Sequence, residues 1–184
     1  RMVNYELGWT QYWMKGKIKM ELTTFMSDGQ NLIVMVPHSP PPPPQYKNSG
    51  EFNNKGIEFL FNYQPLEQLR LHTNYTFIHM KNPLPTTPGH NLFLSGTYHH
   101  EKWQFRLKLQ CIFDLYNETG QGVEVVENNY QLLGTRIGYQ ATRFLNVYLA
   151  VNNLLDEEYQ INYGYPMPGT NFMSGISLKL SKYK

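Results

Sequence analysis

The chain has 184 residues, and its 16 basic and 14 acidic side chains leave a formal net charge of only +2, which gives no indication of a nucleic-acid partner. Mean hydropathy is −0.50 and no apolar run approaches the roughly 20 residues of a membrane-spanning helix, so a helical membrane protein is excluded. The single cysteine, Cys111, excludes an internal disulfide framework.

Apolar and polar residues alternate with a period of two along most of the chain, which is the period of β-strands. No segment with a helical period competes. The pattern predicts an all-β protein with about eight strands, at approximately residues 2–13, 17–35, 52–63, 68–80, 90–99, 102–115, 129–139 with a successor at 143–154, and 170–180. The second segment carries a break at Ser27-Asp28-Gly29, which is either a bulge or a turn.

The two faces of these segments differ in charge. In "WQFRLKLQCIF" (103–113), the apolar residues Phe105, Leu107 and Leu109 alternate with Arg106 and Lys108. The other segments follow the same rule, and the charged face carries Arg70, Arg136 and Lys179 as well. A soluble β-sandwich also alternates. A charge-free face nevertheless favours a transmembrane barrel, because a charge on the lipid side costs about 2–4 kcal/mol at mid-bilayer.

The connections between the predicted strands alternate in length. Short turns are expected at Lys15-Gly16, Gln64–Glu67, His100-Glu101 and Ala141-Thr142, and long connections at 36–51, 80–90, 115–129 and 155–170. Short turns at one rim and long loops at the other are typical of outer-membrane barrels. We therefore expect Pro40–Pro44, Thr86, Gly120 and Tyr163 at one rim, and Gly16, Pro65, Glu101 and Thr142 at the other.

The segment "AVNNLLDEEYQINYGYPMPGTNFMSGISLKL" (150–180) resembles the C-terminal end of TonB-dependent outer-membrane receptors. The shared pattern comprises an Asn-Leu-Leu-Asp, a tyrosine soon after it, a Gly-Tyr, a Pro-x-Pro-Gly turn and a closing strand. The matching residues are Asn153, Leu154, Leu155, Asp156, Tyr159, Gly164, Tyr165, Pro166, Pro168 and Gly169. Upstream, "NYELGW" (4–9), "DGQNLI" (28–33) and "NKGIEF" (54–59) resemble further parts of the same barrel, in the same order.

The resemblance implies that residues 1–184 form the C-terminal sector of an antiparallel up-and-down transmembrane β-barrel of about 22 strands. The plug domain and the N-terminal barrel strands of the family are then expected to be absent from this chain. The implied location is the bacterial outer membrane, in contact with its lipid. Family members usually close on an aromatic residue; here Leu180 is followed by Ser181-Lys182-Tyr183-Lys184, so either Tyr183 takes that role or these residues are an extension.

The implied function is uptake of a scarce, bulky nutrient, energised through the inner-membrane TonB complex. Cobalamin, ferric siderophores and haem are the nutrients that such receptors commonly import, and the layout of the chain looks most like that of the cobalamin receptors. A second hypothesis is a self-contained small barrel of about eight strands with a structural or adhesion role. It requires the strand at Val3–Trp13 to pair with the strand at Phe172–Leu180.

Ligand contacts are expected from aromatic and methionine side chains in or next to the long loops, because these offer a large contact area to an apolar or ring-bearing molecule. These candidates are Tyr46, Met80, His90, Tyr116, Tyr163, Tyr165 and Met167. For some of them the alternative is the aromatic girdle at the headgroup level of the membrane. Trp9, Trp13, Tyr63, Tyr98 and Trp103, near strand ends, are assigned to girdles.

No catalytic, metal or cofactor site is predicted, and no nucleophile–base pair supports an enzyme. His99 and His100 are adjacent in a strand and point to opposite faces, so they chelate poorly as neighbours. The inward Glu6, Glu21 and Glu58 are expected to pair with other charges in the barrel interior and with the missing plug. The run Asp156–Glu158 is interpreted as a solvated loop start, because calcium needs six to eight oxygen ligands.

Overall fold

The computed structural model describes residues 2–36, 45–81, 86–118 and 125–179, with only the backbone described for 31–36, 45–50, 52, 118 and 125–127. Nine strands form one antiparallel sheet: β1 (Met2–Trp13), β2 (Ile18–Val36), β3 (Gln45–Leu66), β4 (Leu69–Met80), β5 (Pro88–His100), β6 (Trp103–Glu118), β7 (Val125–Gln140), β8 (Leu145–Asn152) and β9 (Asn171–Leu178). A 3₁₀ turn, η1 (Met14–Gly16), joins β1 to β2. No helix in the described ranges is long and apolar enough to cross a membrane.

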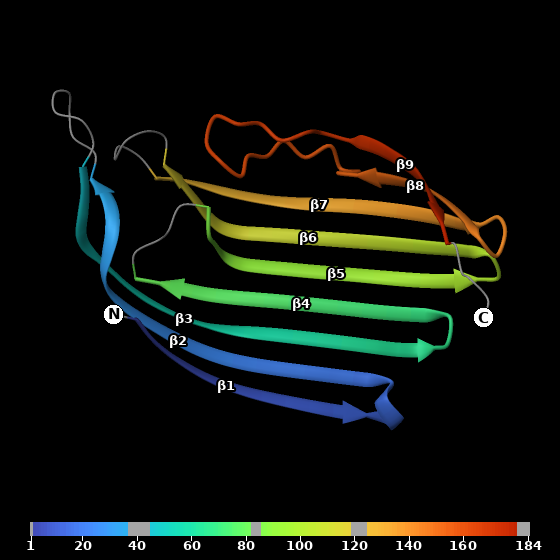
Figure 1. The fold of residues 1–184 in the computed structure, drawn as a ribbon, viewed down its shortest axis with the longest axis horizontal. Coiled ribbons are helices and arrows are strands. Elements are labelled where there is room, and N and C mark those ends of the chain that lie inside the picture. The colour runs from blue at the N-terminus through green and yellow to red at the C-terminus, as the bar shows by residue number, and fades with distance from the viewer. Residues whose placement is uncertain (1, 37–44, 82–85, 119–124, 180–184) are drawn as a thin grey trace.

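Every strand pairs with its neighbours in the sequence, in the order β1 to β9 (Figure 1). The turns after β1, β3, β5 and β7 are short and lie at one end of the sheet, whereas the strand ends joined by the longer connections lie at the other. The two predicted rims are therefore confirmed for the described residues, Thr86 and Tyr163 among them. Pro40–Pro44 and Gly120 lie outside those residues.

The strands extend further toward the loop end than the sequence pattern predicts. β2 and β3 stay paired out to Val36 and Gln45, and β6 and β7 out to Glu118 and Val125. Much of the expected loops 36–51 and 115–129 is therefore paired strand, whereas each of the residue ranges expected as strands corresponds to one of the nine strands of the sheet. The run "NLIVMV" (31–36) lies almost entirely within the expected strand 17–35, and its β-branched residues suit extended backbone.

The expected break at Ser27-Asp28-Gly29 is neither a bulge nor a turn. These residues pair with Asn4, Val3 and Met2 in continuous register, and the register of β2 with β3 shifts only between Gln30 and Ile33. The side chain of Asp28 accepts a hydrogen bond from that of Asn53 on the neighbouring strand. A cross-strand partner thus keeps the polar stretch within the sheet.

One face of the sheet, the apolar face, carries exposed large hydrophobic side chains on every strand. Its members include Leu7, Trp9, Leu22, Ile57, Leu71, Tyr98, Phe105, Leu107, Phe113, Ile137, Leu149, Phe172 and Ile176. Leu107 is 53% exposed and Ile176 is 71% exposed. The opposite face, the polar face, carries the side chains of Glu21, Glu58, Arg106, Lys108 and Arg136.

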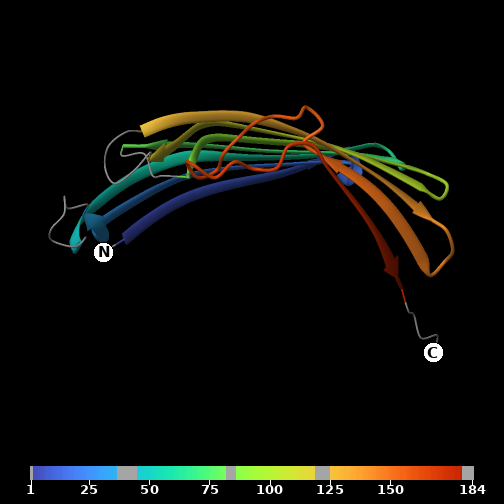
Figure 2. The same cartoon turned by 90° about the horizontal axis from the view of Figure 1, so that it is seen from above.

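The sheet is a single curved layer, and no second sheet covers the apolar face in the part of the chain that the structure describes (Figure 2). A β-sandwich would bury that face against another sheet. The sandwich interpretation is therefore wrong. An exposed apolar face and a charged opposite face are the arrangement of a transmembrane barrel wall, with lipid outside and water or protein inside.

The sheet does not close on itself. Among the described residues, β1 pairs only with β2 and β9 only with β8. Because neighbouring strands alternate in direction and the sheet has nine of them, β1 and β9 run in the same direction. Closure would need a parallel seam in an otherwise antiparallel sheet. The hypothesis of a small, self-contained barrel is not supported by this architecture.

A bulge in β6 changes which residues face which side. The register of β6 with β7 shifts between Ile112 and Leu115, and Asp114 has a left-handed φ of 54°. The backbone N–H of Asp114 donates to Oδ1 of Asn129 at 2.8 Å. The inserted residue brings Leu115 to the same face as Ile112, with which it forms a small buried cluster. Tyr116 therefore falls on the apolar side and Asn117 on the polar side.

Candidate functional site

The connection between β8 and β9, residues 153–170, begins at a buried asparagine. Asn153 is 5% exposed and has a left-handed φ of 50°, which asparagine tolerates better than most residues. Its Nδ2 donates to the backbone oxygens of Glu157 at 2.9 Å and Pro168 at 3.3 Å, and its Oδ1 accepts the N–H of Glu157 at 2.9 Å. One side chain therefore ties the outgoing and returning halves of the connection together.

Asp156 provides a second set of contacts that hold the returning half of the β8–β9 connection in place. Its Oδ1 accepts the backbone N–H of Thr170 at 2.8 Å, and the Thr170 hydroxyl donates to the backbone oxygen of Asn153 at 2.7 Å. A Cβ on Gly169 would lie 2.5 Å from that same Oδ1, so only glycine leaves room for the carboxylate. The residues that carried the resemblance to the receptor family thus have a structural role at the base of this connection.

The middle of the connection folds over the polar face. The Tyr159 ring lies 4.5 Å from that of Tyr130 on β7 and packs against the cluster of Ile112, Leu115 and Tyr130. The backbone N–H of Met167 donates to the oxygen of Tyr159 at 3.0 Å, and the side-chain amide of Asn128 donates to the oxygen of Gln160. These contacts form a buried apolar cluster on the polar face of the sheet.

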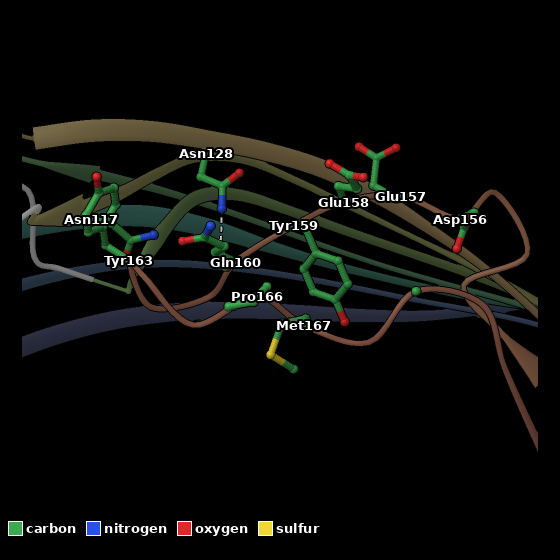
Figure 3. A pocket seen from close by; sticks show the side chains of 11 residues that line it. Asn117, Asn128, Asp156, Glu157, Glu158, Tyr159, Gln160, Tyr163, Pro166 and Met167 are labelled. Carbon is green, nitrogen blue, oxygen red and sulfur yellow. Dashed lines mark hydrogen bonds between the residues drawn. The ribbon is translucent and has the colours of Figure 1, made fainter.

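An open pocket of about 650 Å³ lies between this connection and the loop ends of β6 and β7 (Figure 3). It is lined by Asn117, Asn128, Asp156, Glu157, Glu158, Tyr159, Gln160, Tyr163, Pro166, Met167 and Gly169. A second hollow of about 350 Å³ lies beside it and shares Tyr159 and Met167, reaching down the polar face to Lys108 and Gln110. The volume, the aromatic rings and the few amide and carboxylate groups suit a bulky organic ligand.

Three carboxylates line this pocket, but they do not form a metal centre. In the described ranges, no group of three or more His, Cys, Asp or Glu side chains is arranged to hold a metal ion. One carboxylate oxygen of Asp156 is already bonded to Thr170. The acids give the pocket a negative potential, which favours ligand surfaces that are neutral or positively charged.

The seven expected ligand contacts do not all lie at the pocket. Tyr163 and Met167 line the pocket, whereas Tyr165, 73% exposed, does not. Met80 ends β4, paired with Asn54, away from the pocket. The backbone of Tyr46 pairs with Met35, and its side chain lies outside the described residues.

His90 and Tyr116 face away from the pocket. His90 lies in β5 opposite Phe77 and Phe113, where its Nδ1 is 2.8 Å from the Tyr75 hydroxyl and its Nε2 is 3.4 Å from Asp114. The bulge in β6 places Tyr116 on the apolar face, the same face as His90. Its neighbour Asn117 lines the pocket instead. These two positions agree better with the girdle alternative than with ligand contact.

Several pocket residues were not among the expected ligand contacts. Tyr159 had been noted only as part of a family pattern, and no periodicity or ligand-binding motif singles out Asn117, Asn128 and Gln160. The signal available for Tyr159 was its place in the receptor-like motif after Asp156. The others are recognisable only once the bulge and the folded connection are known.

Replacing Asn153 by alanine should release the connection. The change removes three hydrogen bonds, each contributing about 1 kcal/mol net, and places a less tolerant residue at positive φ. In the folded full-length protein, cleavage by chymotrypsin after Tyr163 should become roughly 10–100 times faster. Asn162→Ala is the matched control, and equal cleavage rates in the two variants would contradict the role of Asn153.

The chain forms a single curved sheet with an exposed apolar face, and its β8–β9 connection is fixed at the loop end. These features define a sector of a large outer-membrane barrel. The sequence model of the TonB-dependent receptor-like β-barrel family matches residues 1–154, and the chain belongs to this family. The family is one of outer-membrane receptors, so the predicted family and fold class are confirmed.

Solved structures of receptors in this class share the fold. The siderophore receptor PiuA from Acinetobacter baumannii superposes with a TM-score of 0.78 at 16% identity, covering 96% of this chain and 28% of that one. The copper transporter OprC gives 0.80 at 17% identity, covering 96% and 31%. The pyoverdine receptor FpvA from Pseudomonas aeruginosa PAO1, bound to pyoverdine, gives 0.78 at 19% identity, covering 97% and 30%. The chain thus spans about three tenths of the length of these proteins.

Proposed function

We propose that the chain is the C-terminal barrel sector of an outer-membrane receptor that imports a scarce, bulky nutrient. In this proposal the plug domain and the N-terminal strands belong to the receptor outside residues 1–184, and import is energised through the inner-membrane TonB complex. Membership of the receptor family and the open, unpaired edges of β1 and β9 support a sector of a larger barrel. The proposal assigns the chain binding and transport, and no catalytic step.

The observation that carries the proposal is the pocket of about 650 Å³ beneath the β8–β9 connection. It lies at the loop end of the sheet, which in this class of barrel faces the cell exterior. It combines the rings of Tyr159 and Tyr163 with amide and carboxylate groups, and the base of the connection is fixed by Asn153 and Asp156. A fixed pocket of mixed character at the outer rim suits capture of a large ligand.

Cobalamin, ferric siderophores and haem are the ligand classes that we propose. The structural neighbours include siderophore receptors and a copper transporter, so the fold accommodates several cargoes. The three carboxylates of the pocket favour a ligand that presents a neutral or cationic surface on this side. A ligand with its negative groups turned toward this sector would be disfavoured.

Two tyrosines of the same connection allow a matched test. In cells that produce the full-length receptor, Tyr163→Ala should weaken saturable binding of the ligand about tenfold, because a buried aromatic contact typically contributes 1–2 kcal/mol. Tyr165→Ala should change it less than about twofold, since this ring does not line the pocket. Radiolabelled cobalamin, a ferric siderophore and haem are the three probes. Equal effects of both substitutions, or no saturable binding of any probe, would overturn the assignment of the pocket.

A further inference from the structure

A polar group interrupts the apolar face near the loop end of β5 and β6. His90 of β5 lies there beside the carboxylate of Asp114 from β6. Aromatic side chains surround the pair: the centre of the His90 ring is 4.8 Å from that of Phe77, and Phe113 is its partner across the strands. Both polar side chains are partly exposed, so solutes reach them from outside the sheet. Neither side chain lines the loop pocket.

The separation of the two side chains matches that of two ligands on one tetrahedral metal ion. Nε2 of His90 lies 3.4 Å from Oδ2 of Asp114. A strong charge-assisted hydrogen bond between such groups would be shorter, at about 2.7–2.9 Å. Zinc bonds of about 2.0–2.2 Å to histidine nitrogen and aspartate oxygen, at the tetrahedral angle, place the two ligand atoms about 3.4 Å apart. Adjacent ligands of an octahedral magnesium ion would be only about 3.0 Å apart.

The other ring nitrogen of His90 has the partner that a metal-binding histidine needs. The Tyr75 hydroxyl lies 2.8 Å from Nδ1. A histidine that binds a metal through one nitrogen donates the N–H of the other to an oxygen, which fixes the tautomer and the orientation of the ring. With its proton on Nδ1 and donated to the Tyr75 oxygen, His90 has the lone pair of Nε2 free for a cation.

The bulge in β6 and a glycine in β5 position the carboxylate. Asp114 has a left-handed φ of 54°, and its N–H donates to Oδ1 of Asn129 at 2.8 Å. Bulges are frequent next to functional sites because they redirect a side chain out of the regular alternation of the strand. A Cβ on Gly89 would lie 2.8 Å from Cβ of Asp114 and 3.0 Å from its Oδ2, so glycine leaves the room that the carboxylate occupies beside His90.

We propose that His90 and Asp114 bind one zinc ion on the apolar face, at the loop end of the sheet. Imidazole and carboxylate are ligands that zinc takes in proteins, whereas magnesium and calcium take oxygen ligands. In the part of the chain that the structure describes, no third His, Cys, Asp or Glu joins the pair, so water completes the four positions around the ion. The ion would tie β5 to β6 beside the bulge. The proposal does not depend on which nutrient the loop pocket binds.

Zinc titration of the tag-free, full-length receptor in detergent tests the site. Isothermal titration calorimetry should show one equivalent of zinc whose affinity falls at least about tenfold in His90→Ala and in Asp114→Asn. Tyr75→Phe keeps the ring and removes only the hydroxyl, and it should also weaken binding about tenfold, because loss of a group that orients a metal ligand typically costs 10- to 100-fold. X-ray absorption at the zinc edge should show four ligands, one of them imidazole.

His79→Ala is the matched control, because His79 is an exposed histidine of the same face on the neighbouring strand β4. It should leave zinc binding unchanged, and heat-modifiable migration in gels checks that every variant is folded. The proposal is wrong if the folded wild type binds no zinc up to about 1 mM, or if His90→Ala and His79→Ala bind zinc equally well. Two or more imidazoles in the absorption spectrum would place the ion at another site. None of these results bears on the binding assay for Tyr163 and Tyr165, so the two proposals fail separately.

Discussion

Residues 1–184 expressed alone should fail to form a stable folded sheet in a lipid bilayer. β1 has 12 residues and β9 has 8, and about half of the backbone groups of each edge strand point away from the sheet, roughly ten N–H and ten C=O in total. Each costs several kcal/mol in hydrocarbon, so the sum exceeds the roughly 5–15 kcal/mol that stabilises a typical domain. Refolding into lipid vesicles, followed by heat-modifiable gel migration and protease protection, measures this directly.

The full-length receptor refolded under the same conditions is the positive control, because in the proposed larger barrel both edges have partners. We expect it to become protease-resistant while the isolated chain stays fully digestible. A protected monomer of residues 1–184 would contradict the open sheet, since it would require β1 and β9 to pair with each other. A protected species found only at high concentration, and cross-linkable as an oligomer, would show that separate copies can supply the missing edges.

Leu107→Arg should impair insertion of the full-length barrel by about 2–4 kcal/mol near the middle of the membrane, a shift of roughly 30- to 1,000-fold in the folding equilibrium. Leu107 is 53% exposed on the apolar face, amid Leu109, Gly96 and Thr135, so a guanidinium there would meet lipid. The adjacent substitution Arg106→Leu should be tolerated for insertion because that side chain points to the interior. Urea titration of the barrel in vesicles gives both free energies of folding.

The neighbouring positions form a matched pair, since they share a strand, a depth in the membrane and a bulky side chain. Equal losses in the two variants would refute the assignment of faces. A larger loss for Arg106→Leu would reverse it.

Much of the barrel wall could be predicted from the sequence because strand alternation is a local property. The side chains of 103–113 take alternating faces whatever lies beside them, so Leu107 and Arg106 were assigned correctly from their spacing alone. The alternation of short turns and long connections followed from glycine, proline and polar residues in the chain. The family motif at 153–169 was also visible, since it depends on residue identities at fixed spacings.

Features that depend on partners distant in the sequence could not be predicted. The bulge at Asp114 shows only in the register against Asn129 on β7, and it alone places Asn117 in the pocket while turning Tyr116 away. The start of β3 at Gln45, where the sequence pattern predicted residue 52, likewise depends on cross-strand pairing, which a periodicity search does not detect.

By itself, the sequence determined the all-β class, the receptor family, the direction of the two faces and the rim at which the longer connections lie. Only the tertiary structure decided that Tyr163 and not Tyr165 faces the pocket, that Tyr159 closes it against Tyr130, and that Arg70, Arg106 and Arg136 share one row across β4 to β7. The physical reason is the separation along the chain between the residues that determine each feature. A strand's period is set by each residue and its neighbours in the chain, whereas a pocket or a charged row is set by register between strands, and one inserted residue changes it.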